Sequence, residues 1–269
     1  MLKQLVKNSL YYSLLALMIG VAIIFISHFD TIANKLLSIK EQRNNMVDSQ
    51  TEEMTTIETP EKIHTINETE TNTATKPLDV PLIQQLPELP RGCEVTSLAM
   101  ILQYNGIFID KMELAEKITY EPFQQGNYKG NMNKGFVGDM KTFENDGLGV
   151  YVDPIIQLAE LYVDPDRIVN ITGTTANHLY DAVDNGYPVW VITNSWFKEL
   201  PAEQFLTWNT AEGPMKVTYR QHSVVITHYD NEFVYVNDPL KNKKNIPLNK
   251  RDFEAAWVQM NQQAMYITS

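Results

Sequence analysis

The hydrophobic and polar positions of residues 77–269 predict helices first and strands later. Val95, Leu98, Ala99 and Leu102 recur at the i, i+3, i+4 and i+7 spacing of one helix face. Further helical patterns cover residues 110–118, 154–162, 176–185 and 250–260, and strand patterns cover residues 188–193, 217–229, 232–237 and 264–268. N-terminal helices that pack on an antiparallel sheet define an α+β fold, and about 190 residues suit one domain.

The first of these helices begins at the only cysteine of the chain. Pro90 and Gly92 favour a helix that starts at Cys93, and Gly106 ends it. A lone cysteine forms neither an internal disulfide nor a zinc site with several thiolates. Because a helix N-terminus carries unpaired N–H groups and a partial positive charge, we expect it to favour the thiolate. Cys93 is therefore either a nucleophile or a small buried apolar residue.

The N-terminal pattern predicts export. Residues 9–27 carry no charge, and nineteen residues at helical rise span about 28 Å, close to the roughly 30 Å of a bilayer core. Lys3 and Lys7 precede this run, so the positive-inside rule places the C-terminal part outside the cell. We expect residues 1–28 to be an uncleaved signal anchor, and a secreted form cleaved near residue 33 is the alternative.

Residues 29–76 have the composition of a disordered extracellular stalk. They hold nine acidic and five basic side chains and no glycine, with nine threonines between Thr51 and Thr75. Such a segment buries too little apolar surface to offset its chain entropy. The formal net charge of −11 argues against nucleic acid as a partner. With one cysteine and no phosphate-binding glycine loop, we expect no cofactor and no metal.

Thiol chemistry needs a base, and the positions of the five histidines leave two candidates on one strand. His28 lies at the membrane edge and His64 in the stalk, and His178 opens a predicted helix and reads as a surface residue. His222 and His228 share one strand, six residues apart, so we expect them on the same face. We take His222 as the base.

The strand with His222 continues into a hairpin that ends at Asp238. If the turn is centred on Asp230, His222 lies opposite Asp238 with β-carbons about 4.5–5.5 Å apart. The carboxylate then orients the imidazole, as in a catalytic triad. A two-residue loop would move Asp238 to the other face and bring Asn237 diagonal to His222. A purely structural hairpin that ends at Asp238 is the remaining interpretation. We expect Asp238 to be the partner of His222.

Four strings agree in order and spacing with a known family. Residues 80–106, 134–139 with 147–151, 222–230 and 234–239 together resemble the bacteriocin-leader-peptidase-like cysteine peptidases of peptidase family thirty-nine, which have a papain-like fold. The resemblance covers nearly all of residues 77–269.

The resemblance implies a role for each site residue. Cys93 would be the nucleophile, His222 the general base and acid, and Asp238 the orienting residue. Gln85 would help to stabilise the oxyanion beside the backbone N–H of Cys93. Where relatives usually carry glycine, this chain has His228, whose side chain would narrow the cleft.

We therefore expect a membrane-anchored extracellular cysteine peptidase that acts on a peptide or protein substrate. The same thiol chemistry would also serve an amidase or acyl transferase on cell-wall peptides. A non-catalytic surface module of the same fold would normally have lost one of Cys93, His222 and Asp238, and the sequence retains all three.

The anchor leads to a direct test. The full-length protein should stay with membranes after carbonate extraction, with residues 77–269 open to external protease. A soluble mature form that begins near Asn34 would contradict the anchor and leave secretion in its place.

Overall fold

The computed structural model describes residues 76–269 of the chain. The expected anchor, residues 1–28, lies outside the described residues, and so does the expected stalk up to residue 75. Within residues 76–269, no helix has the length and apolar character needed to cross a membrane.

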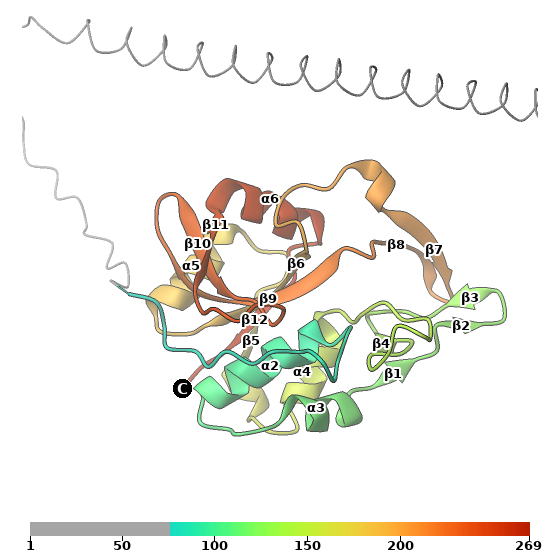
Figure 1. The fold of residues 1–269 in the computed structure, drawn as a ribbon, viewed down its shortest axis with the longest axis horizontal. Helices are drawn as coiled ribbons and strands as arrows, with labels where there is room; N and C mark the ends of the chain where they lie inside the picture. The colour runs from blue at the N-terminus through green and yellow to red at the C-terminus, as the bar shows by residue number, and fades with distance from the viewer. Residues whose placement is uncertain (1–75) are drawn as a thin grey trace, which may run out of the picture. The chain divides into compact units, whose positions relative to one another are not determined.

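A six-stranded antiparallel sheet forms the centre of the domain (Figure 1). Its strand order is β11-β10-β9-β6-β12-β5, and each neighbouring pair is antiparallel. The strands are β5 (Ile168–Asn170), β6 (Val189–Asn194), β9 (Gln221–Tyr229), β10 (Phe233–Asn237), β11 (Ile246–Asn249) and β12 (Ala264–Ile267). The long strand β9 lies between β10 and β6, and side chains on both of its faces are buried.

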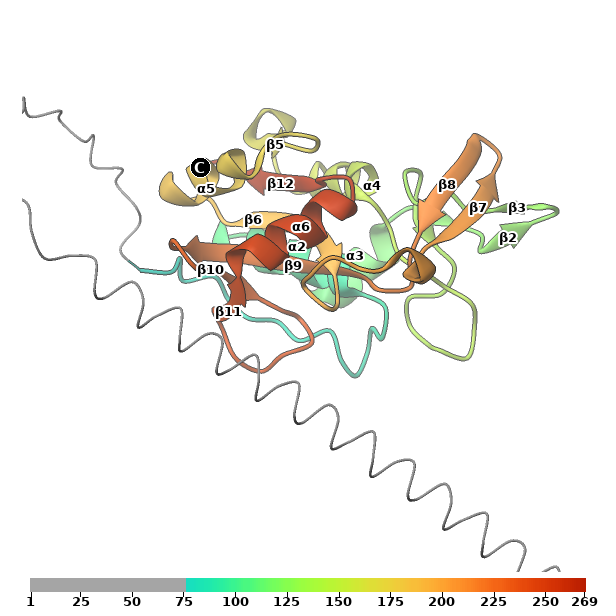
Figure 2. The same cartoon turned by 90° about the horizontal axis from the view of Figure 1, so that it is seen from above.

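Helices cover both faces of this sheet. They are α2 (Cys93–Tyr104), α3 (Lys111–Lys117), α4 (Val152–Ala159), α5 (Ala176–Asp184) and α6 (Lys250–Gln259), with short 3-10 helices at Pro165–Arg167 and Ala202–Gln204. Along β6, Trp190 and Ile192 pack into the cluster of α2, α3 and α4, whereas Val189 and Val191 pack against α5 and α6. Figures 1 and 2 show α2 and α6 on opposite sides of the sheet. The predicted α+β class is confirmed.

Three small strand pairs extend from one end of the domain (Figure 1). They are β1 (Tyr120–Glu121) with β4 (Phe136–Val137), β2 (Gln124–Gln125) with β3 (Tyr128–Lys129), and β7 (Leu206–Thr210) with β8 (Gly213–Val217). The single strand expected over 217–229 is divided, because β8 ends at Val217 and β9 begins at Gln221. Between them, the Thr218 hydroxyl accepts a hydrogen bond of 3.1 Å from the backbone N–H of Arg220, and this contact holds a turn.

Helix α2 begins at Cys93 for a local reason. The Gly92 carbonyl accepts hydrogen bonds from the backbone N–H and the hydroxyl of Thr96, at 3.0 and 2.7 Å. Gly92 has no room for a side chain, since a β-carbon there would lie 2.5 Å from Leu89 Cβ. All residues from Cys93 to Leu102 are buried, so α2 is enclosed on every side.

Candidate active site

Cys93 and His222 line one cavity of about 350 Å³. Cys93 is the first residue of α2, and His222 is the second residue of β9. Asp238 directly follows the end of β10. All three residues are buried: Cys93 is 7% exposed, His222 3% and Asp238 2%. The lining of the cavity comprises Gln85, Pro90, Arg91, Cys93, Phe143, Gly147, Leu148, Ser195, Tyr219, Gln221, His222 and Leu240.

His222 and Asp238 form a buried hydrogen-bonded pair. His222 Nε2 lies 2.8 Å from Asp238 Oδ1, and the same oxygen accepts from the backbone N–H of Leu240 at 2.8 Å. Burial by itself would raise the pKa of the Asp238 carboxyl, but the contact with His222 and the Leu240 N–H outweigh it and lower that pKa. Because the carboxylate is ionised, Nε2 carries the proton and Nδ1 is the free basic nitrogen of the imidazole.

The hairpin register that was expected to produce this pair is wrong. Pairing begins at Val234 with Tyr229, so the turn is longer than the one centred on Asp230. The register then shifts at a β-bulge, where Thr227 is the extra residue. Beyond the bulge, Asn237 pairs with Val225, which sets Asp238 opposite residue 224 and diagonal to His222.

The bulge is held by contacts from distant parts of the chain. The Thr227 hydroxyl donates to the Tyr235 carbonyl and to Asn245 Oδ1, at 3.1 and 2.7 Å. The Thr227 carbonyl accepts from the backbone N–H of Leu78 at 2.9 Å. Without this extra residue, the longer turn would point Asp238 away from the face of His222. The bulge returns it to that face.

His228 does not share a face with His222, contrary to the sequence expectation. The bulge between them reverses the alternation of side chains, and His228 pairs with Tyr235 at a ring separation of 5.2 Å. It does not line the cavity, so the expected narrowing of the cleft by its side chain is also wrong. His178 is exposed on α5, where its Nδ1 lies 3.2 Å from the Thr175 hydroxyl, as expected of a surface residue.

The environment of Cys93 opposes the thiolate, which corrects the expectation drawn from the helix start. Burial raises the pKa of the thiol well above its usual range, and the nearby carboxylate of Glu94 raises it further. The backbone N–H of Ser223 lowers the pKa of the thiol, but by less than burial and Glu94 raise it. The thiol donates a hydrogen bond to Glu94 Oε2 at 3.2 Å. In the free protein, Cys93 is therefore a neutral thiol.

Gln85 lies at the cavity, but its side chain is already engaged. Its Nε2 donates to the carbonyls of Leu89 and Pro90, at 3.1 and 3.0 Å. Both N–H groups of the Gln85 amide therefore already donate to backbone carbonyls. The backbone N–H of Cys93 has no partner within its helix, because it belongs to the first turn of α2.

Two residues of the site, Arg91 in the lining of the cavity and Glu94 beside the thiol, were not singled out from the sequence. Arg91 Nη1 donates to the Asp139 carbonyl at 3.1 Å and to the Thr142 carbonyl, and its guanidinium lies 4.7 Å from the centre of the Phe143 ring. Arg91 thereby fixes one wall of the cavity. The other is Glu94, whose carboxyl contacts the thiol. A charged residue inside an otherwise apolar helix pattern was the signal for Glu94.

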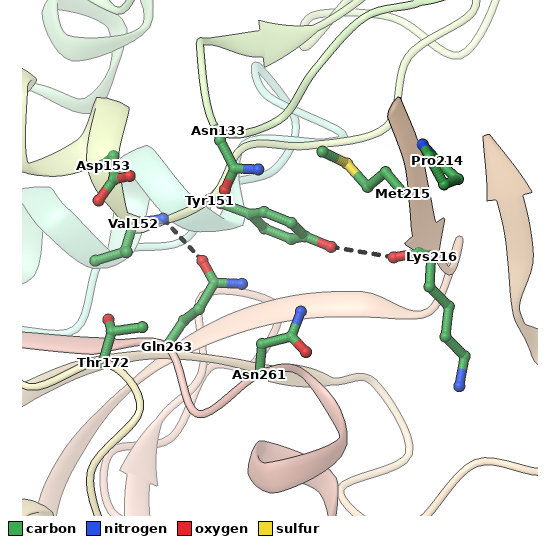
Figure 3. Close-up of a pocket in the computed structure, with 10 residues that line it drawn as sticks. All are labelled: Asn133, Tyr151, Val152, Asp153, Thr172, Pro214, Met215, Lys216, Asn261 and Gln263. Carbon is green, nitrogen blue, oxygen red and sulfur yellow. Dashed lines mark hydrogen bonds between the residues drawn. The ribbon is translucent and has the colours of Figure 1, made fainter. Parts of the chain in front are cut away.

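A second cavity, of about 460 Å³, lies between the start of α4, strand β8 and the turn at 261–263 (Figure 3). At its edge, Gln263 Oε1 accepts from the backbone N–H of Val152 at 2.9 Å. Tyr151 Oη lies 3.5 Å from the Lys216 carbonyl. None of the site residues expected from the sequence lines this cavity.

Comparison with known proteins defines the class of this domain. Residues 77–265 match the model of the Peptidase_C39 like family, and the chain belongs to that family. It is 44% identical over 195 residues to the uncharacterized protein YvpB of Bacillus subtilis (strain 168), covering 71% of this chain and 76% of YvpB. It is also similar to the crystal structure of a candidate C39-like peptidase from Bacillus anthracis, with 48% identity and a TM-score of 0.70. That match covers 71% of this chain and 95% of the other. The papain-like fold expected from the sequence is confirmed.

Asn237, the alternative partner of His222, has a structural role that can be tested. Its Nδ2 donates to the Val80 carbonyl at 3.0 Å, and its Oδ1 accepts from the backbone N–H of Asn245 at 2.9 Å. Asn237→Ala should lower the free energy of unfolding by about 1–3 kcal/mol, because one buried and one partly buried backbone group lose their partners. Urea unfolding measures this loss. A variant as stable as the wild-type protein would contradict the assignment.

Proposed function

We propose that this protein is a membrane-anchored extracellular cysteine peptidase that hydrolyses peptide bonds with Cys93, His222 and Asp238. The observation that carries the proposal is the buried hydrogen bond between His222 and Asp238, next to a cavity that Cys93 also lines. Membership of the C39-like family supports cysteine peptidase chemistry. Retention of all three residues favours an enzyme over a binding module of the same fold.

The chemistry follows from the protonation states. With Nε2–H held by Asp238, Nδ1 of His222 accepts the thiol proton as Sγ of Cys93 attacks the substrate carbonyl. The imidazolium then protonates the leaving amine, and water releases the acyl group from the sulfur. The ionised Asp238 stabilises the imidazolium throughout these steps. No cofactor is required.

The oxyanion would be stabilised first by the backbone N–H of Cys93 at the start of α2. Gln85 can contribute a second donor only if its amide exchanges one of its backbone carbonyl partners for the oxyanion. Loss of one such donor typically lowers turnover by roughly 10²–10³.

The location and substrate complete the proposal. The uncharged run at 9–27, preceded by Lys3 and Lys7, supports a single-pass anchor with the domain outside the cell. The substrate is then an extracellular peptide or protein, or a cell-wall peptide. The excess of acidic side chains argues against nucleic acid.

The roles of the triad residues are tested by substitution. Cys93→Ala and His222→Ala should each abolish turnover of a peptide substrate in steady-state assays. Asp238→Asn should fold normally and lose on the order of 10²–10⁴ in kcat, because the imidazole loses its orientation and its counter-charge. Asn237→Ala is the matched control: its folded fraction should keep the wild-type kcat. An Asp238→Asn enzyme with full activity would overturn the role of Asp238.

The bond that is cleaved is identified from products. Surface proteins and purified wall fragments are incubated with the protein and with Cys93→Ala, and the released fragments are analysed by mass spectrometry. New peptide termini that require Cys93 support the peptidase. Release or transfer confined to wall cross-links would instead assign an amidase or acyl transferase.

A further inference from the structure

Glu94 is a buried carboxylate that faces the thiol of Cys93. The residue is 1% exposed, and its Oε2 accepts the hydrogen bond of 3.2 Å from Cys93 Sγ. Its Oε1 accepts from Gln221 Nε2 at 2.8 Å and from the backbone N–H of Val150 at 3.3 Å. Both oxygens thus act as acceptors, which is the capacity of an ionised carboxylate. A carboxylate is rarely buried without a definite partner or role.

The surroundings of Glu94 are shaped to hold its side chain in place. A β-carbon on Gly149 would lie 2.6 Å from Glu94 Oε1 and 2.5 Å from Gln221 Nε2, so this position has no room for a side chain. Gln221 Nε2 also donates to the Val150 carbonyl at 3.1 Å. The indole N–H of Trp190 donates to the Glu94 carbonyl at 3.0 Å. The carboxylate therefore joins the start of α2, the 149–150 segment and the residue that precedes His222.

We propose that Glu94 is a positioning residue that holds Cys93 in a resting orientation, as a protonated thiol hydrogen-bonded to the carboxylate. The proposal rests on the proposed thiol chemistry of Cys93. It adds that Glu94 keeps this thiol protonated in the resting protein. The thiol becomes reactive when it turns from Glu94 Oε2 towards His222. The proton then moves from Sγ to Nδ1, which leaves a thiolate and an imidazolium with no other reactant.

Two opposing effects act on the charge of Glu94. Burial raises the pKa of its carboxyl, and the hydrogen bonds from its own backbone, Gln221, Cys93 and Val150 offset only part of that rise. Each of these donors stabilises the ionised form. A carboxylate in contact with sulfur then disfavours a second negative charge there, in agreement with the raised pKa of the thiol.

Other titratable or charged groups also face or approach the thiol. His222 on β9 and Asp238 after β10 lie beyond it, and the negative charge of Asp238 opposes the thiolate more weakly than Glu94 does. Arg91 and Tyr219 line the same cavity. Substitution of Glu94 removes the charge that contacts the sulfur and leaves these four groups in place.

The proposal is tested by the pH dependence of alkylation in the full-length protein. Because Cys93 is the only cysteine of the chain, the rate of iodoacetamide incorporation measured by intact mass reports this thiol alone. Wild-type alkylation should have a midpoint above about 8.5, the ordinary value for cysteine. Glu94→Gln keeps the side-chain volume and removes the charge, and it should lower the midpoint by about one pH unit or more. At a fixed pH below both midpoints, that shift is roughly a tenfold faster alkylation.

Two further variants separate charge from structure. Glu94→Asp keeps the carboxylate and should keep the midpoint closer to that of the wild type than Glu94→Gln does. Glu116→Gln removes the same charge from an exposed position of α3 and should leave the midpoint unchanged. A Glu94→Gln midpoint equal to or above that of the wild type would overturn the proposal. An alkylation midpoint of the wild-type protein below about 8.5 would also overturn the proposal, and this measurement does not depend on the folding of the variants.

The alkylation assay contains no substrate, so its result is independent of the proposed peptidase activity. The expected shift in a protein that cleaves no peptide would uphold the role of Glu94 and reject the proposed function. Peptide cleavage that requires Cys93, with no shift in Glu94→Gln, would uphold the function and reject the role of Glu94.

Discussion

The burial of helix α2 on all sides is the constraint on which the candidate site depends. A helix whose residues Cys93 to Leu102 are all removed from water cannot slide or rotate without opening the core around it. The backbone of its first residue, Cys93, is therefore fixed relative to the start of β9. The packing that fixes this backbone also removes the sulfur from water, so the same contacts affect both the place and the charge of the thiol.

Whether Cys93 is a thiol or a thiolate depends on the relative sizes of two opposing effects, the helix N-terminus and burial. A helix N-terminus stabilises a nearby anion by about 0.3–1 kcal/mol, and by up to about 2 kcal/mol in partly buried sites. Removal of an ion from water is opposed by several kcal/mol even after relaxation. Burial therefore outweighs the helix terminus at Cys93, and the carboxylate of Glu94 acts in the same direction. The sequence around Cys93 reveals the helix start, which is the smaller of these effects, but not the burial of the thiol.

Local patterns carried most of what the sequence could predict. The periodicity of apolar residues identified the α+β class and the strand that holds His222, and Pro90 and Gly92 indicated the start of α2 at Cys93. The choice of Asp238 rested on an expected turn, and the actual register depends on a bulge at Thr227. Leu78 and Asn245 hold that bulge, and no pattern within the hairpin contains them. The hydrogen bonds from the Gln85 amide to the carbonyls of Leu89 and Pro90 likewise depend on the three-dimensional path of the chain, which the sequence pattern does not contain.

Two carboxylates flank the proposed reacting groups, and their surroundings assign them opposite effects. Asp238 contacts the imidazole of His222 and fixes its orientation, whereas Glu94 contacts the thiol and disfavours its deprotonated form. In the proposed reaction, Asp238 would support proton transfer from Cys93 to His222, and Glu94 would oppose the separated charges before a substrate binds. In the proposed reaction a substrate carbonyl would change this balance, because the negative charge would pass from sulfur to the carbonyl oxygen near the start of α2. A stable thiolate would then be unnecessary in the free protein. The proposed reaction requires only that the proton leave sulfur for His222 as the new carbon–sulfur bond forms.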